Sequence, residues 1–406
     1  MGDYIPLLSA LIALLAGLAA GKAWERYKLH EGRWIDRRKA RQSPHYIQGL
    51  NFLANNQIDH AIEELGQAAH VDTEAAEIHM ILGNLYREKG QVGRAIEIHQ
   101  QVLQRPRLTK LEHTYGLLCL GVDFRRAGFV ERAREAFAEV LRLDPSNEHA
   151  LLNLQRLHED QRQWDDAYRI RQHLVHEEVR GAEDRHQEIQ AFLENELGLE
   201  AVGRRDFAAA TRWFEKAIER APSVLPTYLH LGDVYHRQGQ AAPAVATWER
   251  LIEAAPDRAY LAFDRLSAAY TASGDPHRFE SLCRRLMQAQ PQDWRARVAL
   301  GRHLAGHGAP AAAFDVLLAA LRNNPHALGV HQAIWETLMQ LGLDRARVKS
   351  YMEQSQDAVF YHDPHICVRC RYRSDELLWR CPHCHEWNSF VEDRLSPAKE
   401  RDEIAT

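Results

Sequence analysis

The chain has 406 residues, which is more than one compact core usually holds and enough for two or three domains or one long repeat array. Its hydrophobic content of 45% and charged content of 26% are ordinary for a globular protein, and its net charge of −5 shows no basic excess, which argues against general nucleic-acid binding. Four of the six cysteines lie between Cys367 and Cys384, which favours metal binding in a reducing compartment over a disulfide framework.

The N-terminus has the features of a membrane anchor. No charged residue lies between Tyr4 and Gly21, and a stretch of ~18 residues is the lower limit for spanning a bilayer. The basic residues that follow are Lys22, Arg26, Lys28, Arg33, Arg37, Arg38, Lys39 and Arg41. Because positive charge is retained on the cytoplasmic side, we expect a single-pass anchor over residues 1–22, a basic juxtamembrane segment over 23–44, and the rest of the chain in the cytoplasm.

Two other interpretations of this stretch are a cleavable signal peptide and a buried helix of a soluble domain. A signal peptide carries its positive charge before the apolar run, whereas the only charged side chain there is Asp3. Gly17 and Gly21 form a small-xxx-small pair that could bring two membrane helices into contact, although such residues are also simply common in membrane helices.

A repeated pattern fills the middle of the chain. It has Gly, an aromatic residue three positions on, Ala at +12, a large apolar residue at +16, a small or apolar residue at +19 and Pro at +24. The best copies are Gly121, Phe124, Ala133, Phe137, Val140 and Pro145; Gly198, Ala201, Ala210, Phe214, Ala217 and Pro222; Gly232, Tyr235, Ala244, Trp248, Leu251 and Pro256; and Gly301, Leu304, Ala313, Leu317, Ala320 and Pro325. Weaker copies begin at Gly49, Gly83, Gln155 and Ser267.

Tetratricopeptide repeats have a period of about 34 residues, and one such period separates Gly49 from Gly83, Gly198 from Gly232 and Ser267 from Gly301. The pattern therefore predicts an all-α, right-handed superhelix of helix pairs over residues 45–350, with close helix contacts at the small positions. The steps from Gly83 to Gly121 and from Gln155 to Gly198 are longer than this period. The second and longer of the two contains the polar stretch 173–190, which we interpret as extended helices at a boundary between sub-arrays or as a tolerated insertion.

In such arrays the inner face of the first helix of each pair binds peptides or partner helices. The register places polar side chains near this expected groove: Asn84, Arg87, Arg125, Arg126, Asn195, His236, Arg237 and Arg302. These residues form a candidate partner groove, although any solvated helix face also carries Arg and Asn.

Cys367-x2-Cys370 and Cys381-x2-Cys384 are the strongest motif in the chain. Two such knuckles supply four thiolates in a tetrahedron, which suits one Zn²⁺ or one Fe ion and leaves no open coordination position. We therefore expect a structural metal-binding domain over residues 365–390, after a linker over 351–364 and before a disordered tail over 391–406. We expect the nearby residues His362, His365, His383 and His385 to lie around the site or on the surface.

Motifs for phosphate binding, zinc hydrolysis, acyl transfer and dinucleotide binding are absent from the sequence, so we do not expect an enzyme.

The order of anchor, basic segment, repeats, Cys-Val-Arg-Cys-Arg-Tyr-Arg and Cys-Pro-His-Cys-His-Glu-Trp-Asn-Ser-Phe closely resembles the lipopolysaccharide assembly protein B (LapB) family of Gram-negative bacteria over essentially the whole chain. The C-terminal part is similar to the rubredoxin-like zinc ribbon of that family, whose metal ligands map to Cys367, Cys370, Cys381 and Cys384. One departure is Arg371, where rubredoxin-type knuckles usually have Gly, and this weakens an analogy with iron redox proteins more than it weakens metal binding.

The resemblance implies an inner-membrane adaptor that promotes degradation of the lipid A pathway deacetylase by the membrane protease FtsH and so regulates lipopolysaccharide biosynthesis. Its implied partners are FtsH, the deacetylase and an inner-membrane regulator that senses lipopolysaccharide, and a homo-oligomer is a further possibility. One alternative is a generic scaffold for enzymes of lipopolysaccharide synthesis and transport, and another is a rubredoxin-like electron carrier.

Overall fold

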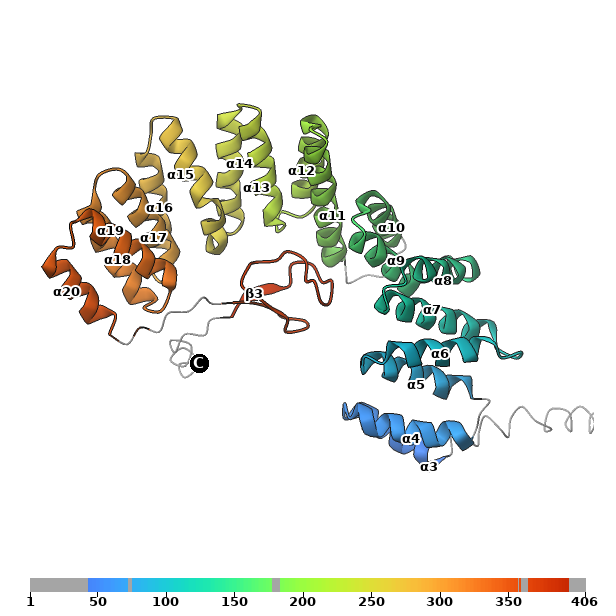
Figure 1. Ribbon diagram of the computed structural model, residues 1–406. Coiled ribbons are helices and arrows are strands. Elements are labelled where there is room, and N and C mark those ends of the chain that lie inside the picture. The colour runs from blue at the N-terminus through green and yellow to red at the C-terminus, as the bar shows by residue number, and fades with distance from the viewer. Residues whose placement is uncertain (1–42, 72–74, 177–182, 357, 359–363, 394–406) are drawn as a thin grey trace, which may run out of the picture. The chain divides into compact units, whose positions relative to one another are not determined.

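The structure is a computed structural model, and it describes residues 43–71, 75–176, 183–356, 358 and 364–393 (Figure 1). The expected anchor, including Gly17 and Gly21, lies outside these residues. No helix among the described residues is both long and apolar enough to cross a membrane.

The described chain is a succession of helices followed by a small sheet, as the repeat pattern predicts. It divides into two compact units, residues 1–163 and 164–406. The helices of the first unit are α3 (Pro44–Ala54), α4 (Ile58–Val71), α5 (Ala76–Glu88), α6 (Val92–Leu103), α7 (Lys110–Arg126), α8 (Val130–Leu143) and α9 (Glu148–Asp160).

Within the described residues, the second unit contains the remaining helices and the three strands. Its helices are α10 (Trp164–His176), α11 (Glu183–Gly203), α12 (Phe207–Arg220), α13 (Leu225–Arg237), α14 (Ala241–Ala254), the 3-10 helix η1 (Pro256–Ala262), α15 (Phe263–Ala272), α16 (His277–Ala289), α17 (Trp294–Gly306), α18 (Pro310–Asn323), α19 (Leu328–Gln340) and α20 (Arg345–Gln354). The boundary between the units precedes the polar stretch 173–190, and α11, at 21 residues, is the extended helix expected there.

The small positions of the repeat are the points of closest approach between paired helices. A Cβ atom added at Gly121 would lie 2.6 Å from the ring of Phe137, and one added at Gly301 would lie 2.6 Å from the Leu317 side chain. The same relation joins Gly49 to Leu65, Gly83 to His99, Gly198 to Phe214 and Gly232 to Trp248. Each pair is the first position and the +16 position of one repeat, so the close helix contact predicted for the small position is confirmed.

The turn between the two helices of a pair uses a left-handed residue seven positions after the Gly slot. Gly128 and Gly239 have φ values of 79° and 74° there. Arg162 and Arg205 hold the equivalent position with φ of 57° and 61°, a conformation that costs a side-chain-bearing residue roughly 1 kcal/mol more than glycine.

The C-terminal sheet consists of β1 (His365–Cys367), β2 (Arg373–Ser374) and β3 (Phe390–Glu392) in the antiparallel order β2-β1-β3. Ile366 pairs with Arg373 on one side and with Val391 on the other. Val391 and Glu392 therefore belong to the sheet, and placing the start of the disordered tail at 391 was wrong, because the backbone of β1 pairs with both residues.

Candidate metal centre and partner-binding residues

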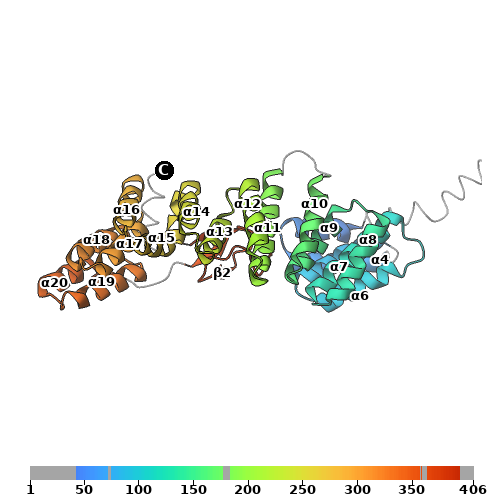
Figure 2. The same cartoon turned by 90° about the horizontal axis from the view of Figure 1, so that it is seen from above.

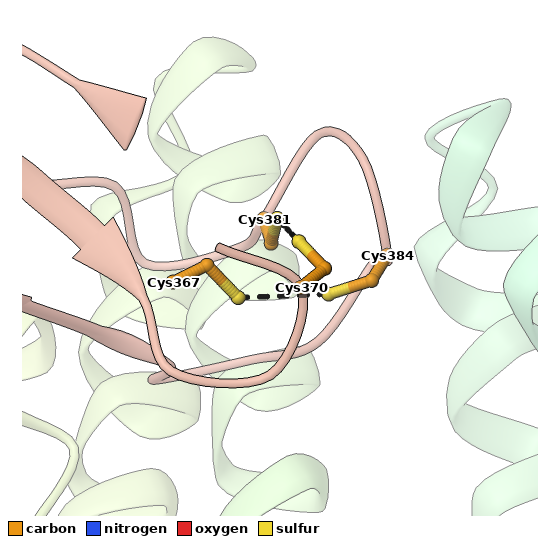
Figure 3. Close-up of side chains that lie close together, drawn as sticks. All are labelled: Cys367, Cys370, Cys381 and Cys384. Atoms are coloured by element: carbon orange, nitrogen blue, oxygen red, sulfur yellow. Dashed lines mark hydrogen bonds between the residues drawn. The ribbon is translucent and has the colours of Figure 1, made fainter. Parts of the chain in front are cut away.

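Four cysteine side chains meet at the end of the small sheet (Figure 3). The sulfur atoms of Cys367, Cys370, Cys381 and Cys384 all lie within 4.8 Å of one another. The Sγ atoms of Cys367 and Cys384 are 3.6 Å apart, as are those of Cys370 and Cys381. Four sulfurs at about 2.3 Å from one zinc ion lie about 3.8 Å apart, so this donor set fits a single tetrahedral metal ion.

The two knuckles have matching backbone geometry. The N–H of Arg371 donates to the carbonyl of Cys367, and the N–H of His385 donates to that of Cys381, both at 2.9 Å. Arg371 and His385 have φ of 63° and 59°, the left-handed turn that closes each Cys-x-x-Cys loop. Arg371 thus adopts the backbone conformation for which rubredoxin-type knuckles use glycine.

The surroundings of the thiols favour binding of a cation. Burial raises the pKa of the Cys367 thiol, but the Ser389 hydroxyl and the knuckle amides outweigh it and lower that pKa to about 6. Burial and the neighbouring thiols raise the pKa of Cys384 to about 12. A bound divalent ion stabilises all four thiolates together, and four thiolate ligands leave it without an open position for water, so its role is structural.

The ribbon, residues 364–393, has only a small core of its own. Cys367, Cys381 and Phe390 form this core, with Leu377 and Leu378 packed against them. A core of this size cannot stabilise the ribbon without metal.

The ribbon is anchored on the repeats through Trp387. This side chain is only 5% exposed and stacks on Phe192 of α11, with ring centroids 5.0 Å apart and planes at 21°. The ring centroid of Trp164 of α10 lies 6.4 Å from that of Trp387. Trp379 also packs against the repeat core.

Polar contacts attach the ribbon to two separate parts of the array. Arg185 of α11 donates to the Glu386 carboxylate at 2.5 Å and to the Trp387 carbonyl at 2.7 Å, and Asn388 donates to Glu188 at 2.7 Å. At the other end, Arg295 of α17 pairs with Glu392.

Burial alone would lower the pKa of the Arg185 and Arg295 guanidinium groups, but their carboxylate partners raise both pKa values above the usual range. Both guanidinium groups therefore keep their charge at the interface. The ribbon spans from α11 to α17, inside the arc that the helices of the second unit form in Figure 1 and beside α13 in Figure 2.

The sequence did not indicate where on the repeats the ribbon docks. Three aromatic residues, Trp379, Trp387 and Phe390, lie beside the cysteines in the sequence, and that position allows them either to form the ribbon core or to dock the ribbon on the last repeats. Only Phe390 belongs to that core, and docking occurs on α10 and α11 and, through Glu392, on α17 of the last repeat copy. The sequence feature that could have indicated this docking surface is the irregular polar stretch 173–190, which contains Arg185 and Glu188.

Of the predicted groove residues in the first unit, Arg87 is engaged within the array. Its guanidinium donates to Asp123 at 2.7 Å and to Asn84 at 2.7 Å, and the buried ring of His99 lies 2.5 Å from the other oxygen of Asp123. Asn84 also donates to the Tyr115 hydroxyl at 3.3 Å. Arg125 lies 3.9 Å from Asp160, while Arg126 is exposed.

The predicted groove residues of the second unit differ in access. Asn195 is only 2% exposed, and its side-chain oxygen lies 2.9 Å from the ring of His230, which leaves it little access to a partner. His236, Arg237 and Arg302 are exposed. Partner binding by any of these groove residues stays a prediction.

Of the four nearby histidines, His362 lies outside the described residues. His365 is partly buried in β1, His383 is exposed and stacks on Tyr372 at 6.4 Å, and His385 follows the second knuckle. Among the described residues, the four cysteines are the one group of metal-ligating side chains close enough to hold an ion.

Comparison with known families matches both parts of the chain. The tetratricopeptide-repeat model matches residues 46–107, 120–169, 195–259 and 272–327, and the rubredoxin metal-binding domain of LapB type matches residues 365–392. The C-terminal part of a tetratricopeptide-repeat protein from Cytophaga hutchinsonii is 12% identical with a TM-score of 0.43, over 71% of this chain and 99% of that chain.

Two similar proteins cover almost the whole length. Lipopolysaccharide assembly protein B of Escherichia coli (strain K12) is 24% identical over 391 residues, 94% of this chain and 97% of the relative. Lipopolysaccharide assembly protein B of Haemophilus influenzae is 26% identical over 398 residues, again 94% and 97%. The repeats, the ribbon and this full-length similarity show that the chain belongs to the lipopolysaccharide assembly protein B family.

Proposed function

We propose that this chain is a non-enzymatic scaffold, anchored in the inner membrane with its bulk in the cytoplasm, that regulates lipopolysaccharide biosynthesis. The observation that carries this proposal is the similarity to lipopolysaccharide assembly protein B over 94% of the chain. The closed four-cysteine site supports a scaffold because it offers no open metal position for substrate or water.

The scaffold acts by bringing the lipid A pathway deacetylase to the membrane protease FtsH, and an inner-membrane regulator that senses lipopolysaccharide controls this step. The anchor confines the repeats to the membrane surface, which raises their effective concentration near a membrane protease. The repeats hold the partners. The metal keeps the ribbon folded, and the folded ribbon holds α11 and α17 in a fixed relation through Arg185 and Arg295.

The test is the half-life and steady-state amount of the deacetylase in cells that lack the chain or carry a variant. Deletion of the gene should lengthen the half-life and raise lipopolysaccharide. Deletion of residues 1–22 should do the same while releasing a folded array, and Cys367→Ser should do so without preventing membrane insertion.

The opposite result has a clear interpretation. An unchanged deacetylase half-life in the full deletion, together with altered lipopolysaccharide, would reject delivery to a protease and favour the generic assembly scaffold. Fractionation of the intact chain away from the inner membrane would reject the anchored arrangement.

A further inference from the structure

The helix α7 is longer than its counterparts in the neighbouring repeats. It has 17 residues, whereas α5 and α9 have 13 each. The extra length accounts for the irregular step from Gly83 to Gly121, which exceeds the usual period of about 34 residues by about one helical turn. The insertion therefore adds one turn to the N-terminal end of α7.

The added turn is well formed. Thr109 caps the helix with a capping box, in which its hydroxyl accepts from the N–H of Glu112 at 3.2 Å and its own N–H donates to the Glu112 carboxylate at 2.9 Å. Such a box satisfies two helix-end amides and stabilises the first turn. The extension is therefore a defined part of the helix and not a frayed end.

This turn extends an apolar stripe along α7. Leu111 is 79% exposed and Tyr115 is 44% exposed, and the half-buried Leu118 and Val122 continue the same line into the core of the unit. The spacings of four, three and four residues place all four side chains on one face of the helix. A leucine with this exposure at the start of a capped helix contributes little to the stability of the unit itself.

Cations stand at both ends of the stripe. Arg107 and Lys110 lie at its N-terminal end and Arg126 at its C-terminal end, all exposed, and none of the three forms an ion pair with another described residue. Glu112, the acidic residue in the first turn of α7, is engaged in the capping box. A ligand with apolar side chains in the middle and carboxylates at its ends complements this surface.

We propose that the stripe Leu111, Tyr115, Leu118 and Val122 is a docking site for an amphipathic helix of a protein partner with acidic ends. A helix fits because the stripe runs along one helix with the spacing that a second helix matches, whereas an extended peptide has no such spacing. The proposal deepens the proposed scaffold function by naming one site that holds a partner, and it rests on that function only for the existence of such a partner.

The test uses the full chain in phosphatidylcholine nanodiscs and an 18-residue synthetic peptide with Leu at i, i+4, i+7 and i+11, Glu at both ends and a benzophenone group. We expect saturable binding, with photoadducts within residues 107–126. The double variant Leu111→Glu with Tyr115→Glu should weaken binding at least tenfold. Both side chains are exposed, and Glu at position 111 lies in the first turn of α7, where the helix dipole favours a carboxylate, so we expect the variant to keep its fold apart from the hydrogen bond from Asn84 to Tyr115; circular dichroism checks this.

The matched control is Met339→Glu on α19, because Met339 is 69% exposed in the other unit. This variant should bind within twofold of the unmodified chain, and a peptide with Lys in place of Glu should bind at least tenfold more weakly. Adducts that map elsewhere, or an equal loss in Met339→Glu, would overturn the proposal.

Two other occupants give distinct results. Binding of the anchor-deleted chain to phosphatidylglycerol vesicles, lost in the double variant while peptide binding is absent, would show a lipid-binding surface. A change of oligomeric state in the double variant by sedimentation would show an interface between copies. Either result overturns the helix-docking proposal, and neither depends on the deacetylase half-life, which tests the scaffold function separately.

Discussion

Replacing Trp387 by alanine should release the ribbon from the repeats while leaving its metal site intact. Trp387 is 5% exposed and packs with Phe192 and Trp164 of the repeat core, not with the ribbon core around Cys367, Cys381 and Phe390. Truncation of a buried Trp costs about 3–5 kcal/mol. This lowers the ratio of docked to undocked ribbon by roughly two to four orders of magnitude.

The ion pairs of the interface cannot compensate for this loss. The pairs Arg185–Glu386 and Arg295–Glu392 are partly exposed, and exposed pairs contribute about 0.2–1 kcal/mol each. The undocked ribbon stays tethered to the array, so the experiment measures a population of open states and not dissociation of the chain.

Hydrogen exchange of α11 and α17 in the full chain, together with metal analysis, checks this prediction. In Trp387→Ala, amides of both helices should exchange faster and the segment between α20 and β1 should be cleaved sooner by protease, with metal still bound in a one-to-one ratio. Trp335→Ala is the matched control, because Trp335 is 40% exposed on α19. Loss of metal in Trp387→Ala, or unchanged exchange in α11, would refute the conclusion that Trp387 belongs to the repeat core and not to the ribbon core.

Three further predictions concern the metal, a buried charge and the repeats. Cys367→Ser should release the metal and unfold the ribbon while circular dichroism at 222 nm keeps most of its helix signal, since metal binding supplies the folding energy of so small a core; stoichiometric metal in the variant would contradict the four-thiolate site. Burial lowers the pKa of His99, but Asp123 and Cys119 raise it to about 9 from 6.5. Protonated His99 therefore stabilises the folded chain fully below pH 6.5, and this stabilisation is lost as pH rises towards 9. The free energy of unfolding should fall by about 3 kcal/mol over this range, measured by urea unfolding and followed by hydrogen exchange of α5 to α7. His99→Phe, which places in this slot the residue found at Phe137, should remove that slope, and an unchanged slope would assign it to another group. Ala244→Arg, at a side chain 1% exposed, should unfold α13 and α14 before the rest of the array, and a single uniform transition by hydrogen exchange would show that the repeats do not unfold separately.

The repeat packing was predictable because its determinants are local. Gly232 and Trp248 occupy the first and the +16 position of one repeat and meet within one helix pair, so a fixed spacing in the sequence encodes the contact. The four metal-ligating cysteines lie within one short segment, and their spacing encodes the site in the same way.

The contacts between distant segments were not predictable in this way. Arg87 pairs with Asp123 of the next repeat, and the same carboxylate contacts His99, which stands in place of the usual apolar residue at the +16 position of Arg87's own repeat. Arg185 and Glu386 are 201 residues apart, and neither has a pattern that indicates the other. The sequence therefore predicts helix pairs and metal ligands, while the position of the ribbon on the array depends on the shape that the repeats form together.

The attachment of the ribbon also sets an order for synthesis of the protein. Ribosomes add about 5–20 residues per second, so roughly 10–40 s separate the appearance of Arg185 from that of Glu386. By the end of this interval α10 to α17 are made, and the surface around Phe192 that Trp387 covers in the finished chain still lies open to solvent. We therefore expect a newly made array to be most vulnerable to proteolysis and association just before its last segment binds metal, and metal supply to limit how quickly the chain matures.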